Sequence, residues 1–397
     1  MPWLVGTALI HSLAVTDKRG AFRNWTVLLA ICAFSLSLLG TFLVRSGVLS
    51  SVHAFATDPA RGLFILAFLV VVVGGSLGLF AWRAPRIPSG GRFAPLSRET
   101  LLLLNNVLLV AAAGSVLIGT LYPLFIDALG LGKLSVGAPY FNTVFVPVTV
   151  PLLFLVALGP LARWKQLEPR ELWSRLRVPA ALALAAGMVL PFLMGRWSPL
   201  VAMGLLLAVW IAASTIFQLR ERLKSGLPPL SFWGMHLAHL GVAVFVAGVT
   251  LVKGYEVEKD VRLAVGDTVQ VGSHAFRLLG VTEVPGPNYV AQRGEIELLA
   301  PDGRRLRTLH PEKRHYLSSR MPMTEAAIDS GIAGDLYVSL GEPLDASGAW
   351  SVRVYDKPFV TWIWAGCLLM AVGGAASAAD RRYRLKKAHA VPRGATA

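Results

Sequence analysis

Histidine is the residue type in this chain most able to do chemistry, and three of its eight copies lie inside long apolar runs. His11 belongs to the first run, while His236 and His239 belong to the run "SFWGMHLAHLGVAVFVAG". Ionisable side chains at membrane depth are rare and commonly mark a functional site. Neutral imidazole is a good ligand for iron, so two such helices could hold a haem between two axial histidines. Histidines hydrogen-bonded to backbone carbonyls, without any metal, are the alternative.

The apolar runs predict an all-α polytopic membrane protein. Only 15% of the residues are charged, whereas a soluble domain carries ~25%. Each run is close to the ~20 residues that a helix needs to cross a bilayer. We expect about nine membrane-spanning helices, the first of them incomplete, over residues 1–16, 25–44, 63–82, 99–122, 143–162, 178–195, 199–219, 230–252 and 358–379.

The distribution of positive charge predicts the orientation of these helices. Loops on one side, together with the tail 380–397, contain 21 Lys and Arg residues, whereas loops on the other side contain four. Basic loops remain in the cytoplasm, so the first set is expected inside. The net charge of +15 therefore reflects topology, and no nucleic-acid partner is expected.

This orientation places the buried histidines at similar depths. At 1.5 Å per residue, His11 lies ~8 Å and His239 ~14 Å from the cytoplasmic ends of their helices, in the inner half of the bilayer. His236 is only three residues from His239, so it is an alternative second ligand. The small neighbours Ala238 and Gly241 would let a flat macrocycle approach the backbone, which favours His239.

The remaining histidines are less distinctive. His53 lies in the short outer loop "LVRSGVLSSVHAFATDPARG" (43–62), where an ordinary exposed side chain is as good an interpretation as a ligand. We expect the other four, His274, His310, His315 and His389, on solvated surface. Cys32 and Cys367 fall inside predicted helices and are interpreted as packing residues. No CxxCH motif is present for covalent attachment of haem to this chain.

One region departs from the membrane pattern. Residues 253–357 contain 13 Lys and Arg residues and alternating segments such as "DTVQVGSHAFRLLGV" and "WSVRVYD". Such alternation is typical of half-buried strands. We therefore expect a transmembrane bundle (1–252), a β-rich extracytoplasmic domain (253–357), a final transmembrane helix (358–379) and a basic cytoplasmic tail (380–397).

Several motifs resemble the cytochrome c maturation protein F (CcmF) family. They are the stretch from "PWLVGTALIHSLAVTDKRG" to "SSVHAFATDPARG" (2–62), then "GAPYFN" (137–142), "EPRELWSR" (168–175) and "WGMHLAHLGVAV" (233–244). The resemblance runs from residue 1 to the tail and is to the C-terminal part of a CcmF. It implies a haem lyase subunit of the bacterial inner membrane, with residues 253–357 in the periplasm.

The resemblance also implies roles for individual residues. His11 matches the first transmembrane ligand of a structural haem b, and His239, the histidine of "AHLG", matches the second. His53 matches an outer-face histidine that ligates the haem being delivered. No catalytic nucleophile or acid–base pair is expected in the chain, because the implied reaction joins haem vinyl groups to the CxxCH thiols of an apocytochrome.

The chain also departs from the family pattern. The family's tryptophan-rich WWD motif, which holds the delivered haem, and the first outer-face histidine are not found in the 397 residues. We therefore expect either a fragment or the product of a split gene, with a separate N-terminal CcmF half as a partner. As a part of a haem lyase complex the chain would take part in thioether formation, but alone it should be inactive.

The implied partners are the haem chaperone CcmE, the apocytochrome-handling subunits CcmH and CcmG, apocytochrome c and membrane quinol. Two alternative functions are an electron-carrying cytochrome b subunit and the paralogous haem lyase dedicated to nitrite reductase. A transporter would show interrupted helices in paired halves. Pro147, Pro151 and Pro191 interrupt predicted helices, but no repeat accompanies them, so a transporter is not favoured.

Overall fold

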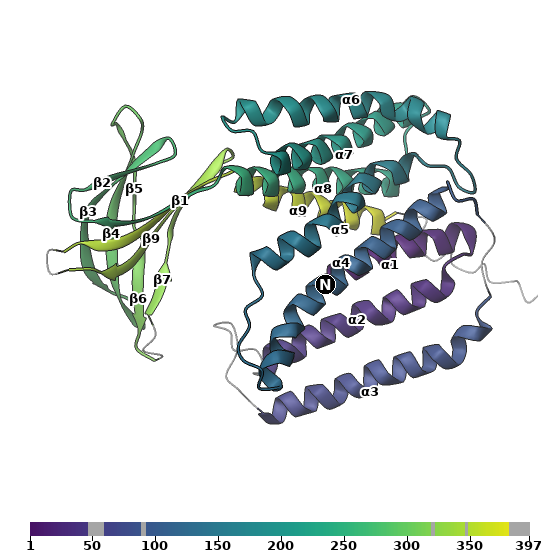
Figure 1. Ribbon diagram of the computed structural model, residues 1–397, viewed down its shortest axis with the longest axis horizontal. Helices are drawn as coiled ribbons and strands as arrows, with labels where there is room; N and C mark the ends of the chain where they lie inside the picture. Colours follow the sequence, from purple (N-terminus) through teal and green to yellow (C-terminus); the bar gives the residue numbers. More distant parts are fainter. Residues whose placement is uncertain (47–58, 89–92, 319–321, 346–347, 381–397) are drawn as a thin grey trace, which may run out of the picture. The chain divides into compact units, whose positions relative to one another are not determined.

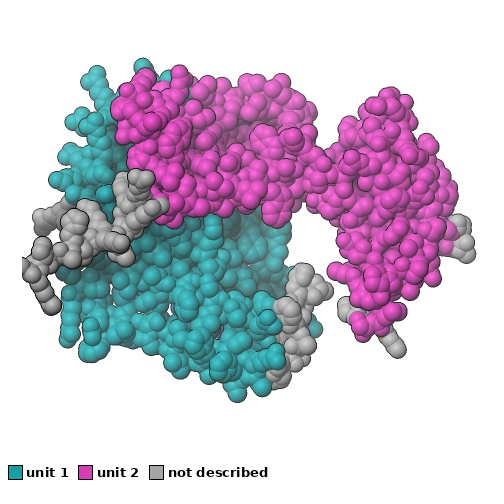
Figure 2. Space-filling view, turned by 180° about the vertical axis from the view of Figure 1, so that it is seen from behind, with its two compact units in different colours: residues 1–179 teal, residues 180–397 magenta. Residues whose placement is uncertain are grey.

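The computed structural model describes residues 1–46, 59–88, 93–318, 322–345 and 348–380. They form two compact units, residues 1–179 and 180–397, shown in separate colours in Figure 2. Unit 1 contains α1 (Pro2–Arg19), α2 (Arg23–Arg45), α3 (Pro59–Arg83), η1 (Ala84–Arg86), α4 (Arg98–Ala128), α5 (Ala138–Leu158) and η2 (Gly159–Leu161). Helix α6 (Pro169–Leu193) crosses the boundary between the units.

Unit 2 continues with three further helices and all the strands (Figure 1). The helices are α7 (Pro199–Leu223), α8 (Leu230–Tyr255) and α9 (Val360–Ala378). The strands lie between α8 and α9: β1 (Val257–Leu263), β2 (Thr268–Val271), β3 (His274–Pro285), β4 (Tyr289–Leu299), β5 (Arg305–Leu309), β6 (Glu312–Tyr316), β7 (Pro322–Glu325), β8 (Ala327–Ser330), β9 (Gly334–Pro343) and β10 (Trp350–Pro358).

The predicted helical membrane fold is confirmed. Among the described residues, eight helices, α2 to α9, are long and apolar enough to cross a membrane. Helix α1 has 18 residues, but its last turn contains Asp17, Lys18 and Arg19, and a membrane crossing by α1 stays a prediction. Pro147 and Pro151 lie inside α5, which continues through both, so no broken helix of the transporter kind forms there.

Unit 1 is held together by small and branched side chains on four of its helices. The buried core contains Val5 and Ala8 of α1, Leu29 of α2, Leu109 and Ala113 of α4, and Leu152 of α5. Cys32 packs against this cluster as a free thiol, which agrees with a packing role. In α1 the buried positions recur every three or four residues, the spacing that places side chains on one helix face. This face fixes α1 against α4.

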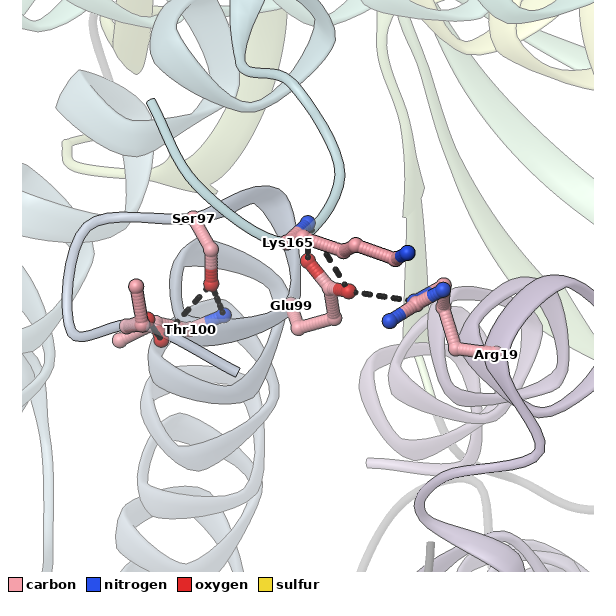
Figure 3. Close-up of polar contacts among 6 residues, drawn as sticks. Arg19, Ser97, Glu99, Thr100 and Lys165 are labelled. Atoms are coloured by element: carbon pink, nitrogen blue, oxygen red, sulfur yellow. Dashed lines mark hydrogen bonds and ion pairs between the residues drawn. The ribbon is translucent and has the colours of Figure 1, made fainter. Parts of the chain in front are cut away.

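A buried carboxylate at the start of α4 fixes the same two helices at a second place (Figure 3). Glu99 is 1% exposed and accepts a hydrogen bond from Arg19 Nε of α1 at 2.8 Å. It also accepts the backbone N–H of Lys165 at 3.0 Å. Lys165 adopts a left-handed conformation with φ of 72°. A buried charge is tolerated only when it is paired and hydrogen-bonded in this way, so the junction ties α1, α4 and the segment after η2 together.

Helices α8 and α9 approach each other along glycines spaced seven residues apart. Gly234, Gly241 and Gly248 of α8 face α9, and a Cβ on Gly241 would lie 2.7 Å from the carbonyl oxygen of Gly366. A Cβ on Gly366 would in turn lie 2.6 Å from the backbone nitrogen of Phe245. Small residues let membrane helices pack backbone to backbone, which increases their dispersion contacts.

We expect Gly366→Ala to lower the thermal unfolding midpoint of the chain in detergent by several degrees. The added methyl group would meet α8 backbone, which cannot move aside as a side chain can, at an expected cost of ~1–3 kcal/mol. Gly374→Ala in the same helix is the matched control, because a Cβ there meets nothing within 4 Å. The control should be neutral or slightly stabilising, since alanine favours helix. Equal midpoints for the two variants would contradict this packing.

The strands form a β-rich domain, as the alternating segments predicted. One sheet has the order β1-β10-β9-β8, and the other has the order β2-β3-β4-β6-β7, with β5 paired to β4. All the pairs are antiparallel. Alternate residues of both sheets point into one core, which includes Phe276, Leu278, Ile296, Leu298, Val338, Leu340, Val352 and Val354. The domain therefore has a hydrophobic core separate from the helices.

We expect residues 253–358, produced alone, to fold as a mostly β domain whose stability falls in acid. Glu312 is 6% exposed; burial alone would raise its pKa, but hydrogen bonds from Arg314 and Arg293 lower it. A carboxyl with a depressed folded-state pKa stabilises the fold above its unfolded pKa of about 4.5, and this stability is lost as the pH falls through the lower folded value. Urea unfolding, followed by circular dichroism at a series of pH values, measures how the stability of the domain depends on pH.

Glu312→Gln should flatten the acid branch of that profile, and Glu283→Gln on an exposed position of β3 should leave it unchanged. A helix-dominated spectrum, or identical acid branches for wild type and Glu312→Gln, would refute the prediction.

Candidate haem-ligand site

His11 lies on α1 and meets a buried amide of α4. Asn105 Nδ2 and His11 Nδ1 are 3.0 Å apart, and Asn105 is 6% exposed. The pair lies along the interface that the Arg19–Glu99 junction also fixes. Sequence reasoning missed Asn105. The signal was present in "LLLLNNVLLV", where two adjacent amides stand in an apolar run.

A chain of hydroxyl groups joins α1 to α2 beside His11. Thr16 Oγ1 donates to the carbonyl oxygen of Ala21 at 2.9 Å, which uses its one proton. Thr26 must therefore donate to Thr16, at 2.8 Å, and Ser12 to Thr26, at 2.7 Å. These bonds run in one direction and satisfy each hydroxyl proton, so they hold α1 and α2 in a single register next to His11.

The second amide of α4 is different. Asn106 is fully buried, and neither its Nδ2 nor its Oδ1 has a hydrogen-bond partner among the described residues. Unsatisfied amides inside a protein are unusual and costly. Unit 1 therefore carries an unpaired polar group one residue from the partner of His11.

His236 on α8 is held in one tautomer. Its ring is 2% exposed and stacks on Phe232 with centroids 4.0 Å apart. Nδ1 lies 2.8 Å from the carbonyl oxygen of Phe232, which can only accept, so Nδ1 carries the proton. Nε2 is then a bare lone pair, and it has no hydrogen-bond partner among the described residues. This is the form of a histidine that binds a metal through Nε2.

The small neighbours of His239 do not leave room for a macrocycle, and the expectation based on them was wrong. A Cβ on Gly241 would collide with the backbone of Gly366, and a Cβ on Gly373 would lie 2.5 Å from the backbone nitrogen of Ala238. Ala238 and Gly241 thus face α9, which occupies the space beside them. His239 lies about 140° around α8 from Gly234 at 100° per residue, away from this seam.

The three histidines of the predicted haem site fall in two units. His11 belongs to unit 1, and His236 and His239 belong to unit 2. Each unit supplies a helix-borne imidazole of the kind that haem iron accepts. His236 has an Nε2 without a hydrogen-bond partner among the described residues, which is the form that fits iron, and the fit of His11 depends on which atom of the Asn105 amide faces its Nδ1.

The outer-loop histidine, His53, lies outside the described residues, as do Asp58 and His389. The helices on either side of it are described. Ser46, directly after α2, lies close to Gly62 of α3, since a Cβ on Gly62 would be 3.2 Å from Cα of Ser46. The end of α2 and the start of α3 are therefore in close contact. The histidines of the β-rich domain agree with solvated surface, since His310 and His315 are exposed and His274 is half-buried.

This fold defines a class: a helical multi-pass membrane protein with three histidines on its apolar helices and an antiparallel β-sandwich before the last helix. Comparisons agree with it. Residues 254–358 match the family described as CcmF C-terminal beta-sandwich. The chain is 54% identical over 395 residues to the cytochrome c-type biogenesis protein CcmF of Pseudomonas aeruginosa, covering 97% of this chain and 60% of that protein.

Two further relatives bear on the assignment. The cytochrome c-type biogenesis protein NrfE of Haemophilus influenzae is 36% identical over 395 residues, covering 98% of this chain and 61% of that protein. A solved structure, Cytochrome c Heme Lyase CcmF, matches with a TM-score of 0.76 and 26% identity, over 95% of this chain and 58% of that one. The chain is therefore similar to CcmF proteins along nearly all of its length, and it spans about three fifths of the length of the relatives it matches.

Proposed function

We propose that this chain is part of a haem lyase that attaches haem covalently to apocytochrome c at the outer face of the bacterial inner membrane. The observation that carries the proposal is the 54% identity to a cytochrome c-type biogenesis protein along 97% of the chain. The helix-borne histidines of both units are consistent with it, because imidazole is a common ligand of haem iron.

Two haem sites at different heights are part of the proposal. His11 and His239 would hold a structural haem b through their imidazoles, His236 being the alternative to His239. His53 ligates the delivered haem, which is the substrate. Reduction of the substrate iron, with electrons from membrane quinol, is the chemistry that haem b supplies when bound. The protein holds the two sites apart and sets their environment.

The covalent step needs little from the side chains of this chain. Each thiol of the CxxCH motif adds across a vinyl group of the substrate: a carbon–sulfur bond forms, the thiol proton ends on the other vinyl carbon, and no group leaves. The addition involves no net oxidation. His53 would hold the substrate iron, and positioning of the vinyl groups against the thiols would supply the rate.

The placement and partners follow from the same proposal. The basic loops face the cytoplasm and the β-rich domain faces the periplasm, where it docks partners beside the outer haem site. Those partners are CcmE as haem donor, CcmH and CcmG on the apocytochrome side, apocytochrome c itself, and membrane quinol. A separate N-terminal CcmF half is a further proposed partner, which would complete the substrate site.

A haem lyase for nitrite reductase is the second candidate. The chain is 36% identical to NrfE of Haemophilus influenzae and 54% identical to CcmF of Pseudomonas aeruginosa. The larger identity favours general cytochrome c maturation. A cytochrome b subunit that only carries electrons would keep the buried ligands but would mature no cytochrome.

The experiment is complementation in a strain that lacks its own CcmF. A chimera would carry residues 1–397 in place of the matching part of the Pseudomonas aeruginosa protein, together with a reporter apocytochrome containing one CxxCH motif. We expect haem-stained reporter on a denaturing gel. The chimera without residues 1–397 is the control and should give none. A chimera that inserts into the membrane and matures no reporter would overturn the proposal.

A further inference from the structure

The amide of Asn105 is placed to control the chemistry of His11. Asn105 is 6% exposed, its Nδ2 lies 3.0 Å from His11 Nδ1, and the residues are 94 positions apart on helices packed in one unit. Whatever the amide presents to the ring therefore decides which ring nitrogen carries the proton.

The amide can face the ring in two ways, which differ by half a turn. With Nδ2 toward the ring, as the 3.0 Å contact places it, the amide donates to Nδ1, and the single proton of the neutral imidazole stays on Nε2. With Oδ1 toward the ring, Nδ1–H donates to the oxygen, and Nε2 is a bare lone pair. The two amide orientations have almost the same shape. Only the second one lets Nε2 bind iron.

We propose that Asn105 is the positioning residue of the haem b site: its Oδ1 accepts the Nδ1–H of His11 and thereby presents Nε2 to the iron. The inference rests on the proposed role of His11 as an axial ligand. Partners of this kind orient a metal-binding histidine and raise its basicity, and so set the potential of the metal. Asn105 does not itself touch the haem.

The neighbouring Asn106 provides a matched control. It is an amide of the same size, on the same helix and also buried, but it lies about 100° further around α4. Neither of its amide atoms has a hydrogen-bond partner among the described residues, so it does not bond to His11. A general effect of replacing a buried amide in α4 would be seen at both positions, whereas control of His11 would be seen only at Asn105.

The test is an optical redox titration of the haem in the full chain purified from membranes. Asn105→Asp offers only acceptor oxygens to Nδ1–H and strengthens the imidazole as a donor, so the midpoint potential should become more negative at unchanged haem content. Asn105→Leu removes the acceptor, so the potential should become more positive. Asn106→Leu should leave it unchanged. A purely structural role would not move the two Asn105 variants in opposite directions.

The outcomes separate this inference from the function on which it rests. Unchanged potentials in haem-bearing Asn105→Asp and Asn105→Leu, or an equal shift in Asn106→Leu, would overturn the inference alone. Absence of haem from the wild-type chain, or its full retention in His11→Ala, would overturn both. Should Asn105→Leu fail to accumulate, the isosteric Asn105→Asp decides by itself: a wild-type or more positive potential refutes the role.

Discussion

His53→Ala should abolish cytochrome c maturation by the chimera while leaving the membrane haem b in place. His53 is proposed to ligate the iron of the delivered haem, and alanine offers no donor atom there. The two effects separate because His11 and His239 lie on apolar helices, whereas His53 belongs to the polar stretch of sequence between α2 and α3 and lies outside the described residues. The measurements are haem-stained reporter cytochrome in cells and the visible spectrum of the purified protein.

Added imidazole should partly restore maturation in His53→Ala, because a free ligand can occupy the vacated coordination position. Arg61→Ala, at the exposed start of α3, and Asp58→Ala, five positions after His53, are the controls. Surface charges contribute ~0–1 kcal/mol, so both controls should mature the reporter at close to the normal level. If His53→Ala matured as much reporter as the wild type, His53 would not be a ligand.

His239→Ala should lose the b-type haem, and His236→Ala should keep it. The resemblance of "AHLG" to the family motif is the basis for proposing His239 as the second ligand, and His239 lies about 140° around α8 from Gly234, away from the seam with α9. His236 is the competing ligand, because its Nδ1–H donates to the carbonyl oxygen of Phe232 and its Nε2 has no partner among the described residues. Absorbance spectra of the two purified variants decide between them. Loss of haem in His236→Ala alone would transfer the ligand role to His236.

The general fold could be predicted because its signals are local. Apolar runs of the right length gave the helices, and period-two alternation gave the β-rich domain over 253–357, where the strands now lie at 257–358. The strand order could not be predicted. β1 pairs with β10 across 93 positions, as Asp260 opposite Arg353 shows, and no local pattern encodes that pairing.

The candidate site could be predicted only in part, for the same reason. A histidine in an apolar run is visible in the sequence, so His11 was found. Its partner Asn105 is 94 positions away, and two adjacent asparagines do not reveal which helix they face. The Arg19–Glu99 contact, 80 positions apart, was missed likewise.

The glycines of α8 show how one local pattern can have two meanings. Small residues beside His239 suit either a macrocycle or a neighbouring helix, and the sequence around them does not distinguish the two. The spacing of seven between Gly234, Gly241 and Gly248, matched by Gly366 and Gly373 in α9, indicates a helix partner. Reading both segments together would have corrected the interpretation.

The role of His11 as a haem ligand is tested most directly by the reduced-minus-oxidised visible spectrum of His11→Ala. The variant and the wild type are both purified from membranes and compared at equal protein concentration. The wild type should show a b-type haem. The variant should lose most of that absorbance, because one axial ligand is gone from a low-dielectric site where water cannot replace it. Full retention of the haem with an unchanged spectrum would contradict the role of His11, and with it the haem site proposed for this chain.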